Sequence, residues 1–310
     1  MYVLNSLIPV FLLIALGKAL TRASFFSADL GRSLNLLTYW IALPALLIDK
    51  ITQAAISSAE VSRISLLLIL ATLVSIPIGY LAATVLKVER RALGAFVQGS
   101  VRANNAFIGL PVILYALSDL YPGVEASATL ALAPAIIFYN IFSVSILLVH
   151  SDREKQNLSA ARLFVRQILT NPLLLACFFG IAFNALGLHF PIAIERSLTA
   201  LGNTALALAL LSIGSSLSFK GIGHGLSRSL TASTIQVFIQ PLIGLIFALL
   251  WGLPAMERQI LLIYLACPAA VATYVMADIF GSDRDLAAHI IVVSTLLSAI
   301  SLSLVIALGG

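Results

Sequence analysis

Long apolar runs separated by short polar connections dominate the sequence. Ten of these runs approach the roughly 20 residues that a membrane-spanning helix requires. Apolar residues occur all round the helix that each run predicts, as expected for helices that face lipid and one another. The predicted spans are 3–20, 33–52, 63–86, 92–117, 124–149, 167–187, 196–217, 230–252, 258–280 and 286–308. The pattern therefore predicts an all-α membrane protein with ten transmembrane helices.

Composition supports this interpretation and excludes a soluble domain of ordinary size. Of the 310 residues, 60% are hydrophobic and only 10% are charged, whereas soluble domains carry about 25% charged residues. The chain contains no His-Glu-x-x-His, no P-loop and no paired-Asp motif, so we expect no enzyme activity, metal or cofactor. Cys177 and Cys267 lie far apart inside apolar runs, which indicates buried thiols rather than a disulfide.

The distribution of basic residues predicts how the chain crosses the membrane. With the N-terminus outside, thirteen Lys and Arg fall at inner loops and helix ends, four fall outside, and Arg102 lies within a span. The positive-inside rule then places the 150–166 loop in the cytoplasm and both termini on the periplasmic side of a bacterial inner membrane. The net charge of +5 therefore indicates membrane orientation and not nucleic-acid binding. No basic residue precedes the first run, which favours a first span over a cleaved signal peptide.

The 150–166 loop divides the spans five and five, into 1–149 and 167–310, and the two halves are weakly similar at an offset of about 165. The matching residues are Pro9 with Pro172, Pro77 with Pro241, and Glu89 with Glu257. Because each half has an odd number of spans, the second half enters the membrane in the opposite orientation. Inverted repeats of this kind are typical of transporters whose binding site lies near mid-membrane.

Polar residues gather in the middle of the fourth predicted span. Arg102, Asn104 and Asn105 lie there, and a charged Arg at mid-helix costs about 2.5–3.5 kcal/mol on insertion scales. Pro111 lacks a backbone N–H and presses its ring against the carbonyl four residues earlier, while Gly109 permits unusual dihedral angles. We therefore expect this stretch to be unwound or kinked.

The ninth predicted span carries Pro268 at a similar depth. A half-helix that begins after each break directs its partly positive N-terminus towards the membrane centre. Two such ends beside Asn amides and an Arg predict a binding site for an anion. Plainer interpretations remain open: a Pro that only kinks its helix, Asn side chains that bond neighbouring helices, and an Arg102 that pairs with a carbonyl.

Acidic residues avoid the middle of the predicted spans. All thirteen Asp and Glu lie in loops or near span ends, whereas cation sites and proton relays often place an acid at mid-membrane. This distribution favours an anionic substrate. Asp278 and His289 are the two candidates for proton coupling, but we favour the interpretation that both lie at solvated helix ends.

Three segments resemble the auxin efflux carrier family, whose bacterial members include malonate and malate permeases. They are Arg102 to Pro111 in the fourth span, Ala42 to Leu47 in the second, and Pro268 to Ala277 in the ninth. The spans, loop positions and length match across essentially the whole chain. The resemblance implies an elevator-type carrier of two inverted five-helix repeats. Helices 1, 2, 6 and 7 would form a scaffold that usually dimerises, and helices 3–5 and 8–10 the moving domain, with broken helices 4 and 9 crossing at the site.

The resemblance and the polar pattern together predict the site. Its substrate-binding residues would be Arg102, Ala103, Asn104, Asn105, Pro268, Ala269, Ala270 and Thr273, with helix breaks at Pro44, Gly109 and Pro111. In the plant carriers each crossing pairs a Pro with a following polar residue, but here Ala103 replaces the first Pro and Ala269 occupies the second polar position. The loss of one donor favours a small dicarboxylate, such as malonate or malate, over auxin-like substrates. A sodium-coupled organic anion carrier of the bile-acid type is the main alternative, and a membrane-embedded enzyme is a further one.

Overall fold

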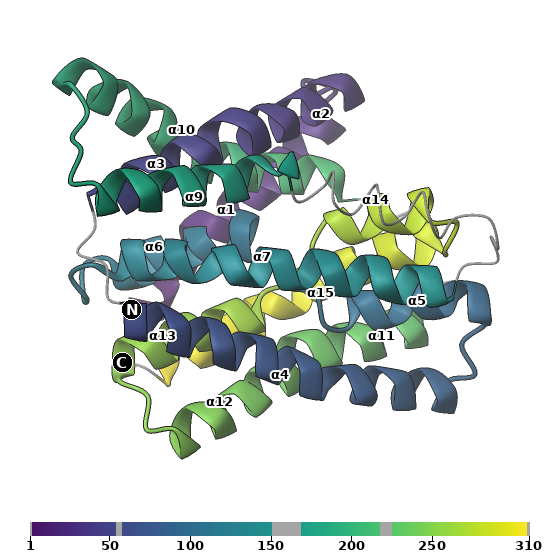
Figure 1. Cartoon of the computed structure of the whole chain (residues 1–310). Coiled ribbons are helices and arrows are strands. Elements are labelled where there is room, and N and C mark those ends of the chain that lie inside the picture. The colour runs from purple at the N-terminus through teal and green to yellow at the C-terminus, as the bar shows by residue number, and fades with distance from the viewer. Residues whose placement is uncertain (1, 54–57, 151–168, 218–224, 309–310) are drawn as a thin grey trace. The chain divides into compact units, whose positions relative to one another are not determined.

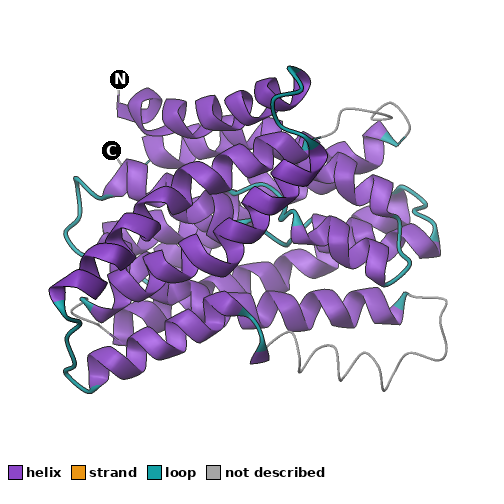
Figure 2. Cartoon of the chain, turned by 90° about the horizontal axis from the view of Figure 1, so that it is seen from above, coloured by secondary structure: helices purple, strands orange, loops and turns teal. Residues whose placement is uncertain are grey.

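The computed structural model describes residues 2–53, 58–150, 169–217 and 225–308. Within these ranges the regular structure is helical, apart from one isolated bridge between Ala103 and Ala269 (Figure 2). Residues 151–166 of the predicted cytoplasmic loop lie outside the described residues. The helices of the first half are α1 (Tyr2–Arg22), α2 (Ala28–Leu37), η1 (Thr38–Ala42), α3 (Leu43–Thr52), α4 (Ser58–Val85), α5 (Arg90–Gly99), η2 (Asn105–Gly109), α6 (Leu110–Leu117) and α7 (Val124–Val149). Those of the second half are α9 (Pro172–Ala185), α10 (Ile192–Ser216), α11 (Leu226–Thr234), η3 (Ile235–Ile239), α12 (Gln240–Leu250), α13 (Ala255–Ala266), α14 (Ala272–Ile279) and α15 (Arg284–Ala307).

The predicted all-α membrane class is confirmed by the length and hydropathy of these helices. In the described part of the chain, seven helical segments are long and apolar enough to cross a membrane. They correspond to seven of the ten predicted spans. The predicted spans 92–117 and 258–280 are each divided between two shorter helices, and within 167–187 the described helix is α9, with 14 residues.

The chain divides into two compact units that alternate along the sequence. The first comprises Met1–Ser62, Ala106–Ile136 and Ile168–Ser216, and the second Arg63–Asn105, Ile137–Gln167 and Leu217–Gly310. Helix α7 contributes its first half to one unit and its second half to the other. The proposed division into the repeats 1–149 and 167–310 stays a prediction.

Glycines allow close helix packing in the first unit. Gly17 of α1 faces the backbone of Leu211 in α10, and Gly214 of α10 faces the carbonyl of Ile14, so that a Cβ at either glycine would overlap the opposite main chain. Small residues at such contacts are typical of membrane helices, whose association depends on close van der Waals packing. Helix α3 packs against both α9 and α10, and Figure 1 shows α3 running beside α9.

The second unit packs its helices around the two interrupted segments. Helix α15 contacts α5, α11, α13 and α14. Tyr264 of α13 and Phe96 of α5 are among the largest fully buried side chains of the second unit. An ion pair joins α4 to α13: Arg63 Nε donates to Glu257 Oε2 at 2.8 Å, and its Nη2 donates to the other carboxylate oxygen. Glu257 is buried, so the pair fixes the beginning of α13 against α4.

Three short π-helical segments each precede a proline by the same spacing. Pro44 follows η1, Pro111 follows η2 and Pro241 follows η3, in each case as the second residue after the segment. The carbonyl that a proline ring would strike lies four residues earlier, which is the middle residue of each π segment. The wider π turn accommodates this carbonyl, so the helix continues past the proline. Pro44, Pro111 and Gly109 consequently lie in continuous helix, and Gly109 has ordinary helical dihedral angles (φ −60°, ψ −51°).

Candidate functional site

The fourth and ninth predicted spans are interrupted at similar positions. Helix α5 ends at Gly99, and η2 begins at Asn105. Helix α13 ends at Ala266, Cys267 is extended (φ −67°, ψ 149°), and α14 begins at Ala272. The first interruption therefore lies upstream of Gly109 and Pro111, at the polar residues themselves.

The two interrupted stretches pair with each other through the main chain. Asn104 N donates to the carbonyl of Pro268 at 2.8 Å, and Ala270 N donates to the carbonyl of Arg102 at 2.9 Å. These bonds form the antiparallel bridge between Ala103 and Ala269, whose methyl side chains leave room for the close approach. The pairing brings together six of the residues that the sequence predicted for the site, from 102–104 and 268–270.

Side chains from neighbouring helices bond other backbone groups that the interruptions release. Gln240 Nε2 donates to Val101 O at 3.1 Å, and Gln236 Nε2 donates to Cys267 O at 3.2 Å. Ser301 Oγ donates to Ala266 O at 3.1 Å, and Ser294 Oγ accepts from Ala269 N at 3.0 Å. In a bilayer core no water is available to bond such groups. The four side chains therefore lower the free-energy cost of non-helical backbone at this position, because they satisfy backbone groups that would otherwise lack a partner.

These four supporting side chains were not among the residues predicted from the sequence. Gln236 and Gln240 lie four residues apart, on one helix face, in a span whose other side chains are apolar, Ser or Thr. Gln236 Nε2 also donates to Gln240 Oε1 at 2.8 Å. That spacing could have predicted a polar helix face inside this span. Ser294 and Ser301 gave no comparable signal, because Ser occurs throughout the predicted spans.

The amides of Asn104 and Asn105 are buried and have few partners. Their exposed fractions are 6% and 5%. Neither amide atom of Asn105 makes a hydrogen bond within the described residues, although the Tyr139 hydroxyl lies beside it. The Asn104 side chain likewise makes none of the hydrogen bonds found in the described part of the chain. Buried polar groups are normally hydrogen-bonded, so two neighbouring amides in this state indicate groups that a ligand can satisfy.

Arg102 turns its guanidinium group towards α7. Nη1 donates to Ser143 Oγ at 2.8 Å, Nη2 donates to Asn140 Oδ1 at 3.0 Å, and the group also contacts the sulfur of Met276. Arg102 is 8% exposed. Its positive charge is thus held near the crossing by neutral side chains, and its donors are used at least partly for support.

Thr273 lies in the first turn of α14. It is fully buried, and its Oγ1 donates to Ala270 O at 2.7 Å. This bond ties the start of α14 to the paired stretch. Helix α14 begins directly after the second interruption and η2 directly after the first, and the N-terminus of a helix carries a partial positive charge.

The two coupling candidates lie in different environments. Asp278 is near the end of α14, more than half exposed, and its Oδ1 lies 3.4 Å from Arg284 Nη1. His289 is buried within α15, with an exposed fraction of 8%. No group of three His, Cys, Asp or Glu in the described residues is arranged to hold a metal ion.

Comparison with known proteins adds an independent line of evidence. Residues 2–306 match the model of a family described as "Membrane transport protein". An "Uncharacterized transporter" of Methanocaldococcus jannaschii is 25% identical over 311 residues, covering 97% of this chain and 96% of the relative. An "Uncharacterized transporter" of Methanothermobacter thermautotrophicus is 24% identical, covering 97% and 96%. A "Putative malonate transporter" of Rhizobium meliloti is 23% identical over 305 residues, covering 94% and 91%.

Proposed function

Because the chain belongs to the membrane transport protein family, which is the auxin efflux carrier family of the sequence resemblance, we propose that it carries a small organic anion through the crossing of its interrupted helices. The family and these relatives are transporters and not enzymes. The chain is accordingly a multi-pass membrane transporter. The observation that carries the finer proposal is the pair of buried amides, Asn104 and Asn105, beside the main-chain pairing.

The charge around the crossing supports an anion as the substrate. The stretches 98–109 and 266–274 contain no Asp or Glu, so no acid within them repels a carboxylate. Asn amides donate hydrogen bonds to carboxylate oxygens. The N-termini of η2 and α14 and the nearby positive charge of Arg102 add favourable electrostatics.

We propose a dicarboxylate, with malonate and malate as the leading substrates. The relative named "Putative malonate transporter" supports this class, as does the family resemblance of Arg102 to Pro111. The substitution of Ala103 and Ala269 at positions where plant carriers have a Pro and a polar residue favours a small substrate over an auxin-like one.

An elevator mechanism is the proposed mode of transport. Helices 1, 2, 6 and 7 of the ten-helix numbering form the scaffold and the contact between two copies, while helices 3–5 and 8–10 carry the substrate. The division into two compact units supports this proposal, because most of each predicted group falls within one unit. Both termini lie on the periplasmic side of a bacterial inner membrane, and the lipid bilayer surrounds the apolar helices.

Uptake into proteoliposomes tests the proposed site. We expect Asn104→Ala to abolish uptake of labelled malonate or malate without lowering the melting temperature (Tm) by more than a few degrees. The reason is that the Asn104 amide makes no internal hydrogen bond that its loss would break. Asn203→Ala is the matched control, because Asn203 is exposed on α10 in the first unit.

The same vesicles separate the alternative substrates. Labelled malonate, malate, acetate and a neutral amino acid are compared, each with sodium present and with choline in its place. If Asn104→Ala takes up substrate at the wild-type rate, the substrate does not bind at the crossing of the interrupted helices. Uptake of only the neutral compound would contradict an anion carrier, and strict sodium dependence would favour the bile-acid type of symporter.

A further inference from the structure

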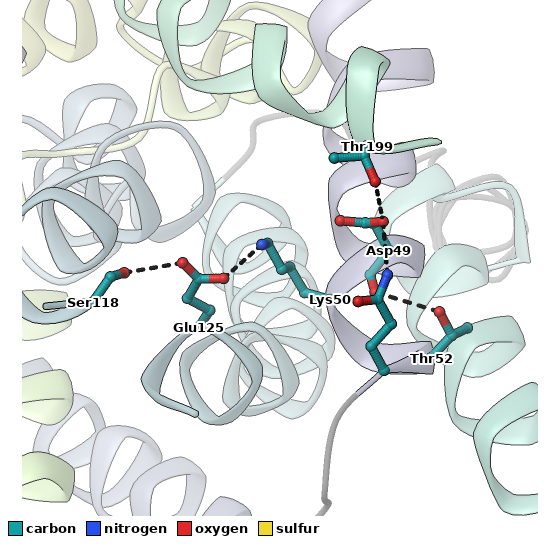
Figure 3. A network of polar contacts seen from close by, with 7 residues as sticks. Asp49, Lys50, Thr52, Ser118, Glu125 and Thr199 are labelled. Carbon is teal, nitrogen blue, oxygen red and sulfur yellow. Dashed lines mark hydrogen bonds and ion pairs between the residues drawn. The ribbon is translucent and has the colours of Figure 1, made fainter. Parts of the chain in front are cut away.

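A buried carboxylate without an ion pair lies near the end of α3 in the first unit. Asp49 is 5% exposed. Its Oδ1 accepts from Thr199 Oγ1 at 2.8 Å and from Gln53 Nε2 at 3.1 Å. Within the described residues its second oxygen, Oδ2, has neither a hydrogen bond nor an ion pair. Figure 3 shows Thr199 bonded to one oxygen of the Asp49 carboxylate, and no line joins the other oxygen to the residues drawn.

The neighbouring lysine does not compensate this charge. Lys50 Nζ lies 2.6 Å from Glu125 Oε2, and Ser118 Oγ donates to the other oxygen of Glu125 at 3.1 Å. Figure 3 shows Lys50 extending from its helix towards Glu125 and not towards Thr199. The two residues at the end of α3 therefore have different electrostatic surroundings. Lys50 is paired, whereas no Lys, Arg or His among the described residues forms an ion pair with the buried Asp49.

Asp49 lines a small cavity formed by α3, α9, α10 and the connection between the last two helices. Its volume is about 50 Å³, and its oxygen-bearing wall consists of Asp49, Thr52, Gln53 and Glu195, with His189 beside them. Phe183 and Phe190 close another side, with their rings stacked at a centroid distance of 4.2 Å. Such apolar side chains offer no competing polar groups and lower the local dielectric constant, which strengthens electrostatic attraction beside them.

The chemistry of this wall suits a cation. Two carboxylates, a hydroxyl and an amide oxygen are hard ligands, which alkali and alkaline-earth ions prefer. Thr52 and Gln53 keep oxygen lone pairs available, since Thr52 Oγ1 donates to Ile48 O and Gln53 donates through its nitrogen. Helix α3 also ends at Thr52, and the carbonyl end of a helix carries a partial negative charge.

We propose that this cavity binds a small monovalent cation, with sodium as the fitting ion. The cavity has room for an ion that keeps some of its waters, because a single water needs only about 10–15 Å³ of such volume. In the described part of the chain no three acidic, His or Cys side chains are arranged as ligands of a metal ion, which disfavours a divalent metal. The site belongs to the first unit and does not rest on the substrate proposed above.

Thermal unfolding of the purified full-length chain tests this assignment. At equal ionic strength, we expect the Tm to be about 2 °C or more higher in sodium chloride than in choline chloride, because an ion that binds only the folded state stabilises it. Asp49→Asn removes the difference. Asp119→Asn keeps it, since Asp119 is an exposed acid of the same unit and its substitution makes the same change in charge.

Direct binding gives a second readout that needs no transport. Radioactive sodium should bind saturably to the wild type and to Asp49→Glu, and more weakly to Glu195→Gln. If Asp49→Asn does not fold, the Glu195→Gln and Asp49→Glu pair still decides the matter. Equal Tm values in the two salts, sodium binding that survives Asp49→Asn, or stabilisation by magnesium but not by sodium would each overturn the proposal.

Discussion

The guanidinium group of Arg102 is engaged on one side by neutral side chains of α7. Its bonds to Ser143 and Asn140 join the first interruption to a different helix of the second unit. Hydrogen bonds to charged groups contribute about 1.5–3 kcal/mol each, so this residue stabilises the crossing substantially. A positioning role explains the geometry better than a direct grip on the substrate.

Substitution by lysine separates the two roles of Arg102. An ammonium group is compact and cannot span two acceptors as a guanidinium fork does. We expect Arg102→Lys to lower the Tm, by an amount that reflects the loss of one charged hydrogen bond. It should retain part of the malonate uptake with little change in KM. Arg284→Lys, at an exposed position, should leave both quantities unchanged.

A tenfold or greater rise in KM, with an unchanged Tm, would instead assign Arg102 to direct substrate contact. Such a rise would correspond to about 1.4 kcal/mol of lost binding free energy, which a supporting residue would not remove selectively. The Tm and KM of the same preparation are therefore measured together.

At this scale the sequence identified polar residues but not their partners. A charge and two amides in an apolar span attract attention by themselves, because each is costly in lipid. Ser143 and Asn140 lie about forty positions further along the chain, and nothing in the spacing of a single sequence relates them to Arg102. Pairing across helices depends on packing, which one sequence does not display.

At the scale of the helices, interruption and continuation have different causes. Prolines alone do not break these helices, since Pro44, Pro111 and Pro241 each follow a π turn that accommodates the ring. The helices break where main-chain pairing replaces helical hydrogen bonds, at 100–104 and 267–271. The sequence predicted an unwound or kinked stretch around Asn104 in the fourth span, but it gave Gly109 and Pro111 as the cause, because the effect of a proline can be read from the sequence whereas the main-chain pairing cannot.

The contact between α1 and α10 is sensitive to a single methyl group. A Cβ at Gly214 would overlap the carbonyl oxygen of Ile14, so Gly214→Ala forces the two helices apart. Overpacking of this kind costs about 1–3 kcal/mol, and we expect a lower Tm and poorer expression. Ser216→Ala, at an exposed position of the same helix, serves as the control. An unchanged Tm for Gly214→Ala would show that α1 and α10 can move apart without a loss of folding stability.

At the scale of the whole molecule, hydropathy and family resemblance were the most informative signals. The membership predicted from Arg102 to Pro111 and two further segments is confirmed by a family match over residues 2–306. Apolar runs of about twenty residues reveal spans directly, because the bilayer imposes their length. Orientation, repeat symmetry and dimerisation stay predictions.

Orientation is tested by labelling single cysteines in intact cells. We expect Ser159→Cys, in the predicted cytoplasmic loop, to resist an impermeant thiol reagent, and Asp119→Cys, in a predicted outer loop, to react. Both native cysteines, Cys177 and Cys267, are fully buried, so they should contribute little background. Labelling of Ser159→Cys from outside together with protection of Asp119→Cys would reverse the assigned topology.

The bridge between Ala103 and Ala269 has an evolutionary consequence. Its two hydrogen bonds join Asn104 N to Pro268 O and Ala270 N to Arg102 O, and backbone atoms are shared by every amino acid except for the missing N–H of proline. A lineage can therefore exchange the side chains at the crossing for others of similar size while the crossing itself persists. Substrate preference can then diverge through a small number of substitutions, without the rebuilding of the helices that carry them.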